Sequence, residues 1–211
     1  MNTPTKITFT RIIMIALLVV GLFVIAFIPN LTIPDIGNSG INWLYFGVFV
    51  FFVIAAFTDF LDGYLARKNN QVTDLGKFLD PIADKMLNDS VLIFLLVPQA
   101  YALNQRRDNL ALTILAVCVI LMIARDLTVD GIRFMAAKKG EVIAANIFGK
   151  VKTVLQMIAI PMMLLNDWPF RYFDSAWPEA LQISNIFMYL ATIMSIVSGV
   201  IYVKQNIKVV K

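Results

Sequence analysis

The sequence has no histidine, a single cysteine and few charged residues. None of its 211 residues is histidine, and charged side chains make up 15% of the chain. The absence of histidine excludes an imidazole base, a phosphohistidine intermediate and a histidine-ligated zinc site, whereas metal chemistry with oxygen ligands stays open. The single cysteine, Cys118, cannot form an intrachain disulfide, and its place in an apolar run favours a buried packing role.

The sequence contains long apolar runs with few charged residues in them. Hydrophobic residues make up 59% of the chain, and their runs are too long for a soluble core, so the composition predicts an integral membrane protein. We expect an all-α chain that forms a single membrane domain over residues 1–211 and crosses the bilayer as six transmembrane helices. The predicted spans are residues 8–28, 41–61, 81–97, 110–123, 143–165 and 180–203.

Some of these helices are expected to extend beyond the bilayer. Residues 59–68 continue the second helix without a breaker, and residues 125–139 can prolong the fourth. Lys6 and Arg11 precede the first apolar run as they would in a signal peptide, but no small-residue cleavage site follows Ile28. The first helix is therefore expected to be retained.

The lysines and arginines predict how the chain is oriented in the membrane. Three of the 18, Arg106, Arg107 and Arg171, fall on one side of the predicted helices, and the rest fall on the other. Because positively charged loops stay in the cytoplasm, both termini are predicted to be cytoplasmic, and segments 29–40 and 166–179 are predicted to be outer loops. The net charge of +4 forms no basic face with interleaved aromatics, so no nucleic-acid partner is expected.

Four aspartates are the most specific feature of the chain. On helices, Asp59 and Asp62 lie one turn apart on one face, as do Asp80 and Asp84, so the two faces can converge on shared divalent cations. An ionised aspartate at mid-bilayer costs about 2.5–3.5 kcal/mol, and a bound metal would neutralise that charge. Carboxylates suit Mg²⁺ and Ca²⁺, and they can bridge two cations about 3.5–4 Å apart at a pyrophosphate. The full spacing is Asp59-x2-Asp62-Gly63-x2-Ala66-Arg67-x8-Gly76-x3-Asp80-x3-Asp84.

Small residues beside the aspartates predict room for a ligand. Gly63 follows Asp62 directly and Ala66 lies one turn beyond it, while Arg67 offers a charged fork for phosphate. Gly76 lies four residues before Asp80 and can clear the corresponding space on the other helix.

Part of the pattern also has a purely structural interpretation. Asp80-Pro81 is a good helix start, with the aspartate as N-cap and the proline in the first helical position. Asp74 and Asp89 fall outside the pattern and are expected to be solvated or capping residues.

The spaced residues match the signature of the CDP-alcohol phosphotransferase family, D-x2-D-G-x2-A-R-x8-G-x3-D-x3-D. Residues 4–11 resemble the family's N-terminal Pro-Asn-x-Ile-Thr-x-x-Arg segment, with Thr5 in place of the usual Asn. Other segments resemble the bacterial members that make phosphatidylglycerophosphate, and they extend the resemblance over nearly the whole chain. These segments are Ala124-Arg125-Asp126, Gly131-Ile132-Arg133, and Gly149-Lys150-Val151-Lys152-Thr153 with Gln156-Met157.

The resemblance implies a fold, a reaction and a location. It implies a six-helix homodimer with the CDP-alcohol phosphotransferase fold, multi-pass in the bacterial cytoplasmic membrane, with its active site on the cytoplasmic side. The implied reaction belongs to phospholipid biosynthesis and transfers a phosphatidyl group from CDP-diacylglycerol to sn-glycerol 3-phosphate, giving phosphatidylglycerophosphate and CMP.

The resemblance also implies roles for the motif residues. Two Mg²⁺ or Mn²⁺ ions would bind at Asp59, Asp62, Asp80 and Asp84, and Asp84 would be the catalytic base for the acceptor hydroxyl. The CMP and CDP side of the site would be formed by Asp62, Gly63, Ala66, Arg67 and Gly76.

The phosphate of the acceptor would need cations of its own. Arg125 and Arg133 lie eight residues apart and can share a helix face, and arginine has the fork geometry for phosphate. Lys150 and Lys152 are two residues apart and cannot share a face, so one of them is expected to point inward. The alternative is that all four are membrane anchors that obey the positive-inside rule.

Other functions stay open on the sequence. The same metal site would serve another acceptor, such as inositol phosphate, phosphatidylglycerol, serine or choline, although the basic segments favour a phosphorylated one. Intramembrane aromatic prenyltransferases also use aspartate-rich magnesium sites but lack the Gly-x2-Ala-Arg block. A cation transporter would need carboxylates spread through the membrane depth, whereas these cluster near one predicted face.

Overall fold

The chain divides into two units, Met1–Arg106 and Arg107–Lys211, and each is described by itself. This computed structural model describes residues 3–28, 31–37, 39–68, 74–97, 108–140, 143 and 146–210. Over these residues the regular elements are helices, with one isolated β-bridge between Asp35 and Asn42. The all-α class is confirmed, and the single membrane domain over residues 1–211 stays a prediction.

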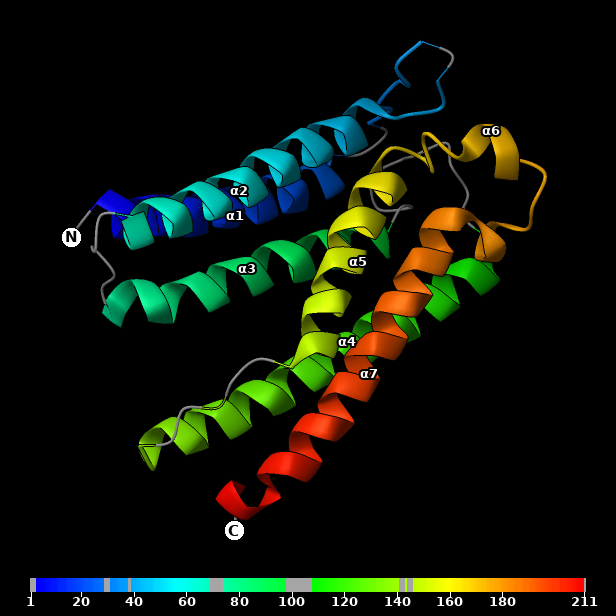
Figure 1. Cartoon of the computed structure of the whole chain (residues 1–211). Coiled ribbons are helices and arrows are strands. Elements are labelled where there is room, and N and C mark those ends of the chain that lie inside the picture. Colours follow the sequence, from blue (N-terminus) through cyan, green and yellow to red (C-terminus); the bar gives the residue numbers. More distant parts are fainter. Residues whose placement is uncertain are drawn as a thin grey trace. The chain divides into compact units, whose positions relative to one another are not determined.

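Three long helices form the first unit: α1 (Thr3–Ala26), α2 (Trp43–Lys68) and α3 (Asp74–Leu95). Figure 1 shows α1 beside α2 and α3, and α1 packs against both. Large apolar side chains from all three helices fill the interior, among them Ile15, Phe52 and Leu92. Because α2 continues to Lys68, the predicted extension over residues 59–68 is confirmed.

The start of α3 differs from one interpretation of the sequence. The interpretation of Asp80-Pro81 as a helix start is wrong, because α3 begins at Asp74 and runs through Pro81. Proline has no N–H, so this turn lacks the hydrogen bond to the carbonyl of residue 77, and the buried side chains of Ala83 and Leu87 hold the helix across the gap. Asp80 and Asp84 therefore lie on successive turns of one continuous helix.

Three long helices and two short ones form the second unit: α4 (Asn109–Lys138), α5 (Ile147–Leu164), α6 (Arg171–Asp174), η2 (Glu179–Leu181) and α7 (Ile183–Val210). In Figure 1 α7, in orange and red, lies against α4 and α5, and it packs along both. Asp108 and Asn146 cap the N-termini of α4 and α5 through their side-chain oxygens. The unbroken α4 confirms that the fourth apolar run is prolonged toward residue 139.

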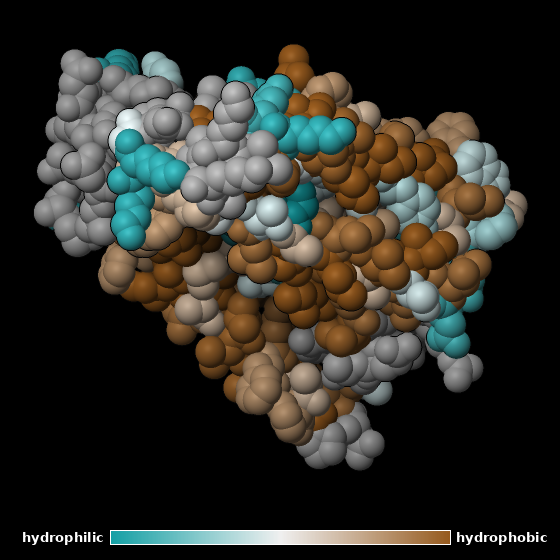
Figure 2. All heavy atoms as spheres, turned by 90° about the horizontal axis from the view of Figure 1, so that it is seen from below, coloured by the Kyte–Doolittle hydropathy of each residue, from teal (hydrophilic) through white to brown (hydrophobic). Residues whose placement is uncertain are grey.

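Several helices are built to contact lipid. Five helical stretches are long and apolar enough to cross a membrane: Lys6–Ala26, Trp43–Leu61, Asn109–Lys138, Ile147–Leu164 and Ile183–Asn206. Large apolar side chains are exposed along them, and brown spheres cover much of the face in Figure 2. A soluble monomer rarely exposes such large apolar patches, so the membrane class is confirmed.

The third predicted span, residues 81–97, is not among these stretches. Residues 81–97 lie mostly in α3, whose charged side chains include Asp84, Lys85 and Asp89. The count of six spans and the cytoplasmic position of both termini therefore stay predictions.

Two buried aspartates hold the start of α7. Asp167 and Asp174, in the connection between α5 and α7, are 3% and 0% exposed. Asp167 Oδ1 accepts a hydrogen bond from Ser184 N at 2.8 Å, and Asp174 Oδ2 accepts one from Ile183 N at 3.0 Å. The second oxygen of each carboxyl is buried with no donor among the described residues. Burial, together with the Asp174 carboxyl, raises the pKa of Asp167 to about 6, and a proton on Asp167 supplies the missing donor.

The protein is expected to lose stability as pH rises through the pKa of Asp167. A carboxyl whose pKa is raised on folding stabilises the folded state fully below its ordinary value of 3.8, and this contribution is lost as pH rises past about 6. Asp167→Asn keeps the acceptor for Ser184 and carries a permanent N–H donor for Asp174. The Tm of the variant relative to the wild type should therefore rise by about 2–4 °C between roughly pH 4 and pH 7, measured by thermal unfolding in detergent. A Tm difference that is constant over this range would contradict the shared proton.

Candidate functional site

Two polar residues of α1 reach the predicted metal ligands. Thr8 and Arg11 lie one turn apart on α1, and both are 2% exposed. The Thr8 hydroxyl donates a hydrogen bond to Asp80 Oδ1 at 2.8 Å, and Arg11 Nη1 forms an ion pair with Asp59 Oδ1. One face of α1 thus contacts a carboxylate from α2 and another from α3.

Asp84 is oriented from within its own helix. The side-chain amide of Asn88, one turn later on α3, donates to Asp84 Oδ1 at 3.0 Å and to the Asp84 carbonyl at 2.9 Å. Asn88 is 7% exposed, so this amide is fixed by its surroundings. The contact limits how the Asp84 carboxylate can turn.

The other motif positions are described in part. Gly63 and Gly76 are half-buried. The side chains of Asp62, Ala66 and Arg67 lie outside the described residues, so their contacts with a metal or a nucleotide stay predictions. Among the described side chains, no three acidic or cysteine residues lie close enough together to hold a metal ion.

Asp59 and Asp80 nevertheless suit a divalent cation. Both present carboxylate oxygens, which are the ligands that magnesium and manganese prefer. The contacts from Thr8 and Arg11 engage Oδ1 of each carboxylate, so Oδ2 of each lies outside these contacts. The Asp59 side chain is 44% exposed, which leaves it accessible to an ion.

A second polar cluster joins three helices of the second unit. Asp126 on α4 accepts hydrogen bonds from Arg125 Nη1 at 2.8 Å and from Lys152 Nζ, on α5, at 2.6 Å. Arg125 Nη2 also donates to Ser198 Oγ, on α7, at 2.5 Å. The side chains of Arg125, Asp126 and Lys152 are 15%, 12% and 8% exposed, so this ion network is largely buried.

The other two predicted phosphate ligands are exposed. Arg133 Nε donates to the Tyr202 hydroxyl at 3.0 Å, and its guanidinium lies 5.5 Å from the centre of that ring. Ser198 and Tyr202 are one turn apart on α7, so Arg125 and Arg133 face the same side of that helix, as their spacing predicts. Lys150 is exposed while Lys152 is buried, which confirms that one lysine of this pair points inward.

Some of the contact residues carried no predicted role. Thr8, Arg11 and Asp126 stand in segments that carry the family resemblance, but each of them contacts a partner on another helix. A polar residue in an otherwise apolar helix is the signal that could have identified them, because such a residue needs a partner.

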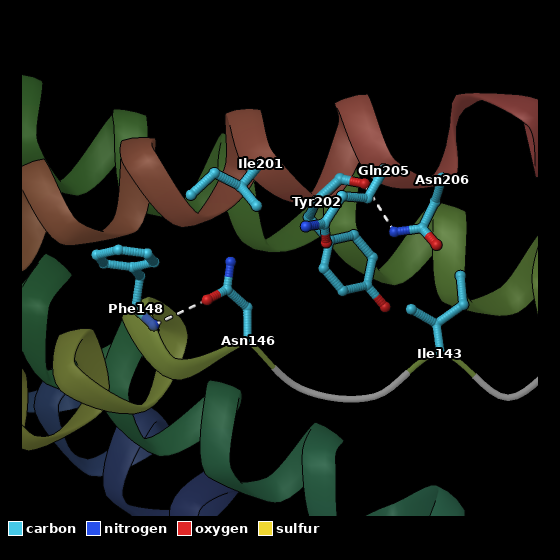
Figure 3. Close-up of a pocket in the computed structure, with 7 residues that line it drawn as sticks. All are labelled: Ile143, Asn146, Phe148, Ile201, Tyr202, Gln205 and Asn206. Atoms are coloured by element: carbon cyan, nitrogen blue, oxygen red, sulfur yellow. Dashed lines mark hydrogen bonds between the residues drawn. The ribbon is translucent and has the colours of Figure 1, made fainter.

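A cavity lies beside Tyr202. Its volume is about 500 Å³, and it is lined by Ile143, Asn146, Phe148, Ile201, Tyr202, Gln205 and Asn206. Figure 3 shows side chains from α7 and from the start of α5 around it. The lining residues are uncharged, so the cavity offers no counter-ion for a phosphate, and we assign it no ligand.

Comparisons with known proteins agree with the resemblance. The family model described as CDP-alcohol phosphatidyltransferase matches residues 1–197. A protein of Bacillus subtilis (strain 168) is 35% identical over 210 residues, which cover 100% of this chain and 97% of that protein. A protein of Rickettsia felis is 32% identical over 206 residues, or 96% of this chain and 94% of that protein.

Both of these relatives are named CDP-diacylglycerol–glycerol-3-phosphate 3-phosphatidyltransferase. A similarly named protein of Arabidopsis thaliana is 34% identical over 158 residues, or 73% of this chain and 64% of that protein. With a matching family model over most of the chain and relatives matched from end to end, the chain belongs to the CDP-alcohol phosphatidyltransferase family.

Proposed function

We propose that the protein transfers a phosphatidyl group from CDP-diacylglycerol to sn-glycerol 3-phosphate, giving phosphatidylglycerophosphate and CMP. The observation that carries the proposal is the full-length match to relatives named for this reaction, in a chain that keeps every position of the aspartate signature. The buried cations Arg125 and Lys152 favour a phosphorylated acceptor over serine or choline.

Asp59, Asp62, Asp80 and Asp84 would hold two Mg²⁺ or Mn²⁺ ions. Support comes from the donor set, which is entirely carboxylate, and from the contacts of Thr8 and Arg11, which hold Asp80 and Asp59 against one face of α1. When bound, the cations neutralise the charge of the pyrophosphate and of the leaving phosphate.

Asp84 is the proposed base. The oxygen of the acceptor hydroxyl bonds to the β-phosphorus of CDP-diacylglycerol while the phosphoanhydride bond breaks. CMP leaves with the electron pair of that bond, and the hydroxyl proton passes to the Asp84 carboxylate. The Asn88 amide, bonded to Asp84 Oδ1, limits how this carboxylate can turn.

The nucleotide and the acceptor phosphate are assigned to different residues. Asp62, Gly63, Ala66, Arg67 and Gly76 are proposed to form the CMP side, on the strength of their motif positions. Arg125 and Lys152 are proposed to bind the acceptor phosphate, with Arg133 and Lys150 at the exposed margin. The distribution of lysine and arginine supports a site on the cytoplasmic side. A bacterial cytoplasmic membrane and a homodimer are proposed from the family resemblance.

Purified protein is expected to incorporate radiolabelled glycerol 3-phosphate into lipid when CDP-diacylglycerol and Mg²⁺ are present. Asp84→Asn keeps the acceptor for Asn88 but removes the base, so the rate should fall about a hundredfold or more. Asp89→Asn is the matched control on the same helix and should retain most of the wild-type rate. A folded wild type that binds CMP and makes no lipid product would redirect the search to another acceptor.

Lys152→Met should weaken acceptor binding more than Lys150→Met. The first variant removes a buried cation and the second an exposed one, so the KM for glycerol 3-phosphate should rise about tenfold in the first and less than about threefold in the second. Steady-state kinetics with each substrate varied in turn would check this. Equal effects of the two variants would contradict a phosphate site at Lys152.

A further inference from the structure

Asp126 links the two buried cations of the second unit. Its two oxygens accept from Arg125 on the same helix and from Lys152 on α5, so one carboxylate holds both cationic groups. The three side chains carry one net positive charge. Their described contacts also leave donors unused, because Lys152 Nζ makes one hydrogen bond and Arg125 Nε is buried without a partner.

Two glycines fix where the Arg125 side chain lies. A Cβ at Gly199, on α7, would be 2.8 Å from Arg125 Cγ, which is closer than real Cβ contacts. A Cβ at Gly149, on α5, would be 3.3 Å from Ser198 Oγ and 3.4 Å from Arg125 Nη2. The backbones of α5 and α7 therefore approach the guanidinium from two sides, and any side chain at position 199 would displace it.

We propose that Asp126 is a positioning residue for the acceptor phosphate, and that the close approach of Gly199 and Gly149 determines where the Arg125 side chain lies. The inference rests on the proposed function, since it takes the acceptor to be phosphorylated. Asp126 holds Arg125 and Lys152 at one place although their charges repel, and the remaining positive charge and unused donors favour a phosphate dianion there.

A substitution at Asp126 can show whether this carboxylate positions the two cations or only neutralises their charge. In Asp126→Asn, the single amide oxygen could accept from only one of the two cations, and the NH₂ group would face the other and could not accept from it. Once Lys152 is replaced, that oxygen can accept from Arg125. The effect of Asp126→Asn on acceptor binding should therefore nearly vanish in the Lys152→Met background.

The experiment measures kcat and both KM values for the wild type, Asp126→Asn, Lys152→Met, their double variant, and Gly199→Ala. Gly47→Ala is the matched control, because a Cβ there meets nothing within 4 Å. We expect Asp126→Asn and Gly199→Ala each to raise the KM for glycerol 3-phosphate about tenfold, with the KM for CDP-diacylglycerol changed less than about twofold. In the Lys152→Met background, Asp126→Asn should add less than about twofold.

Gly199→Ala keeps the proposal testable if Asp126→Asn fails to fold, because it moves Arg125 without changing any charge. The proposal is overturned if Asp126→Asn and Gly199→Ala leave the KM for glycerol 3-phosphate unchanged, or if they change both KM values equally. It is also overturned if the KM increases caused by Asp126→Asn and Lys152→Met multiply in the double variant.

Failure of the proposed function would look different, because the wild type itself would make no lipid product. The positioning role is then decided by the rise in Tm that glycerol 3-phosphate or inorganic phosphate gives to intact protein in detergent. A rise present in the wild type and lost in Gly199→Ala supports the role, and a rise that is absent or equal in both overturns it.

Discussion

A charged side chain among apolar helices needs an opposite charge or a hydrogen-bonding partner from a neighbouring helix. An isolated charge in hydrocarbon costs about 2.5–3.5 kcal/mol even by the lower scales, which is a large fraction of the stability of a domain. Arg11 with Asp59 and Lys152 with Asp126 satisfy this constraint in the two units. Each pair joins two helices, so the position of one helix on another is tied to where the charges lie.

The same residues serve both the fold and the proposed chemistry. In the first unit, α1 supplies Thr8 and Arg11 to acids that the family signature marks as metal ligands. In the second unit, α7 supplies Ser198 and Tyr202 to the arginines assigned to the acceptor. Ligand binding at either cluster therefore changes the contacts that hold helices together, and ligands are expected to stabilise the fold.

The features that depend on local sequence pattern could be predicted from the sequence. Long apolar runs located the helices, the spacing of Asp80 and Asp84 placed them on successive turns, and the two-residue spacing of Lys150 and Lys152 separated an exposed lysine from a buried one. Contacts between distant segments could not be predicted in this way. Thr8 meets a partner 72 positions away, and the closeness of Gly199 to Arg125 exists only once α4 and α7 have packed. Pro81 inside α3 shows the same limit, because tertiary packing overrode the local preference for a helix start.

The four spaced aspartates are proposed to bind divalent cations. A Mn²⁺ titration of the purified protein with CMP present, followed by electron paramagnetic resonance, tests this for the wild type and Asp80→Asn. The amide oxygen of the new side chain can still accept the Thr8 hydrogen bond, so the substitution removes a metal ligand while keeping that contact. We expect about two bound ions per chain in the wild type and fewer in the variant. An unchanged stoichiometry in the variant, or no bound ion in the wild type, would rule out a metal site at these aspartates.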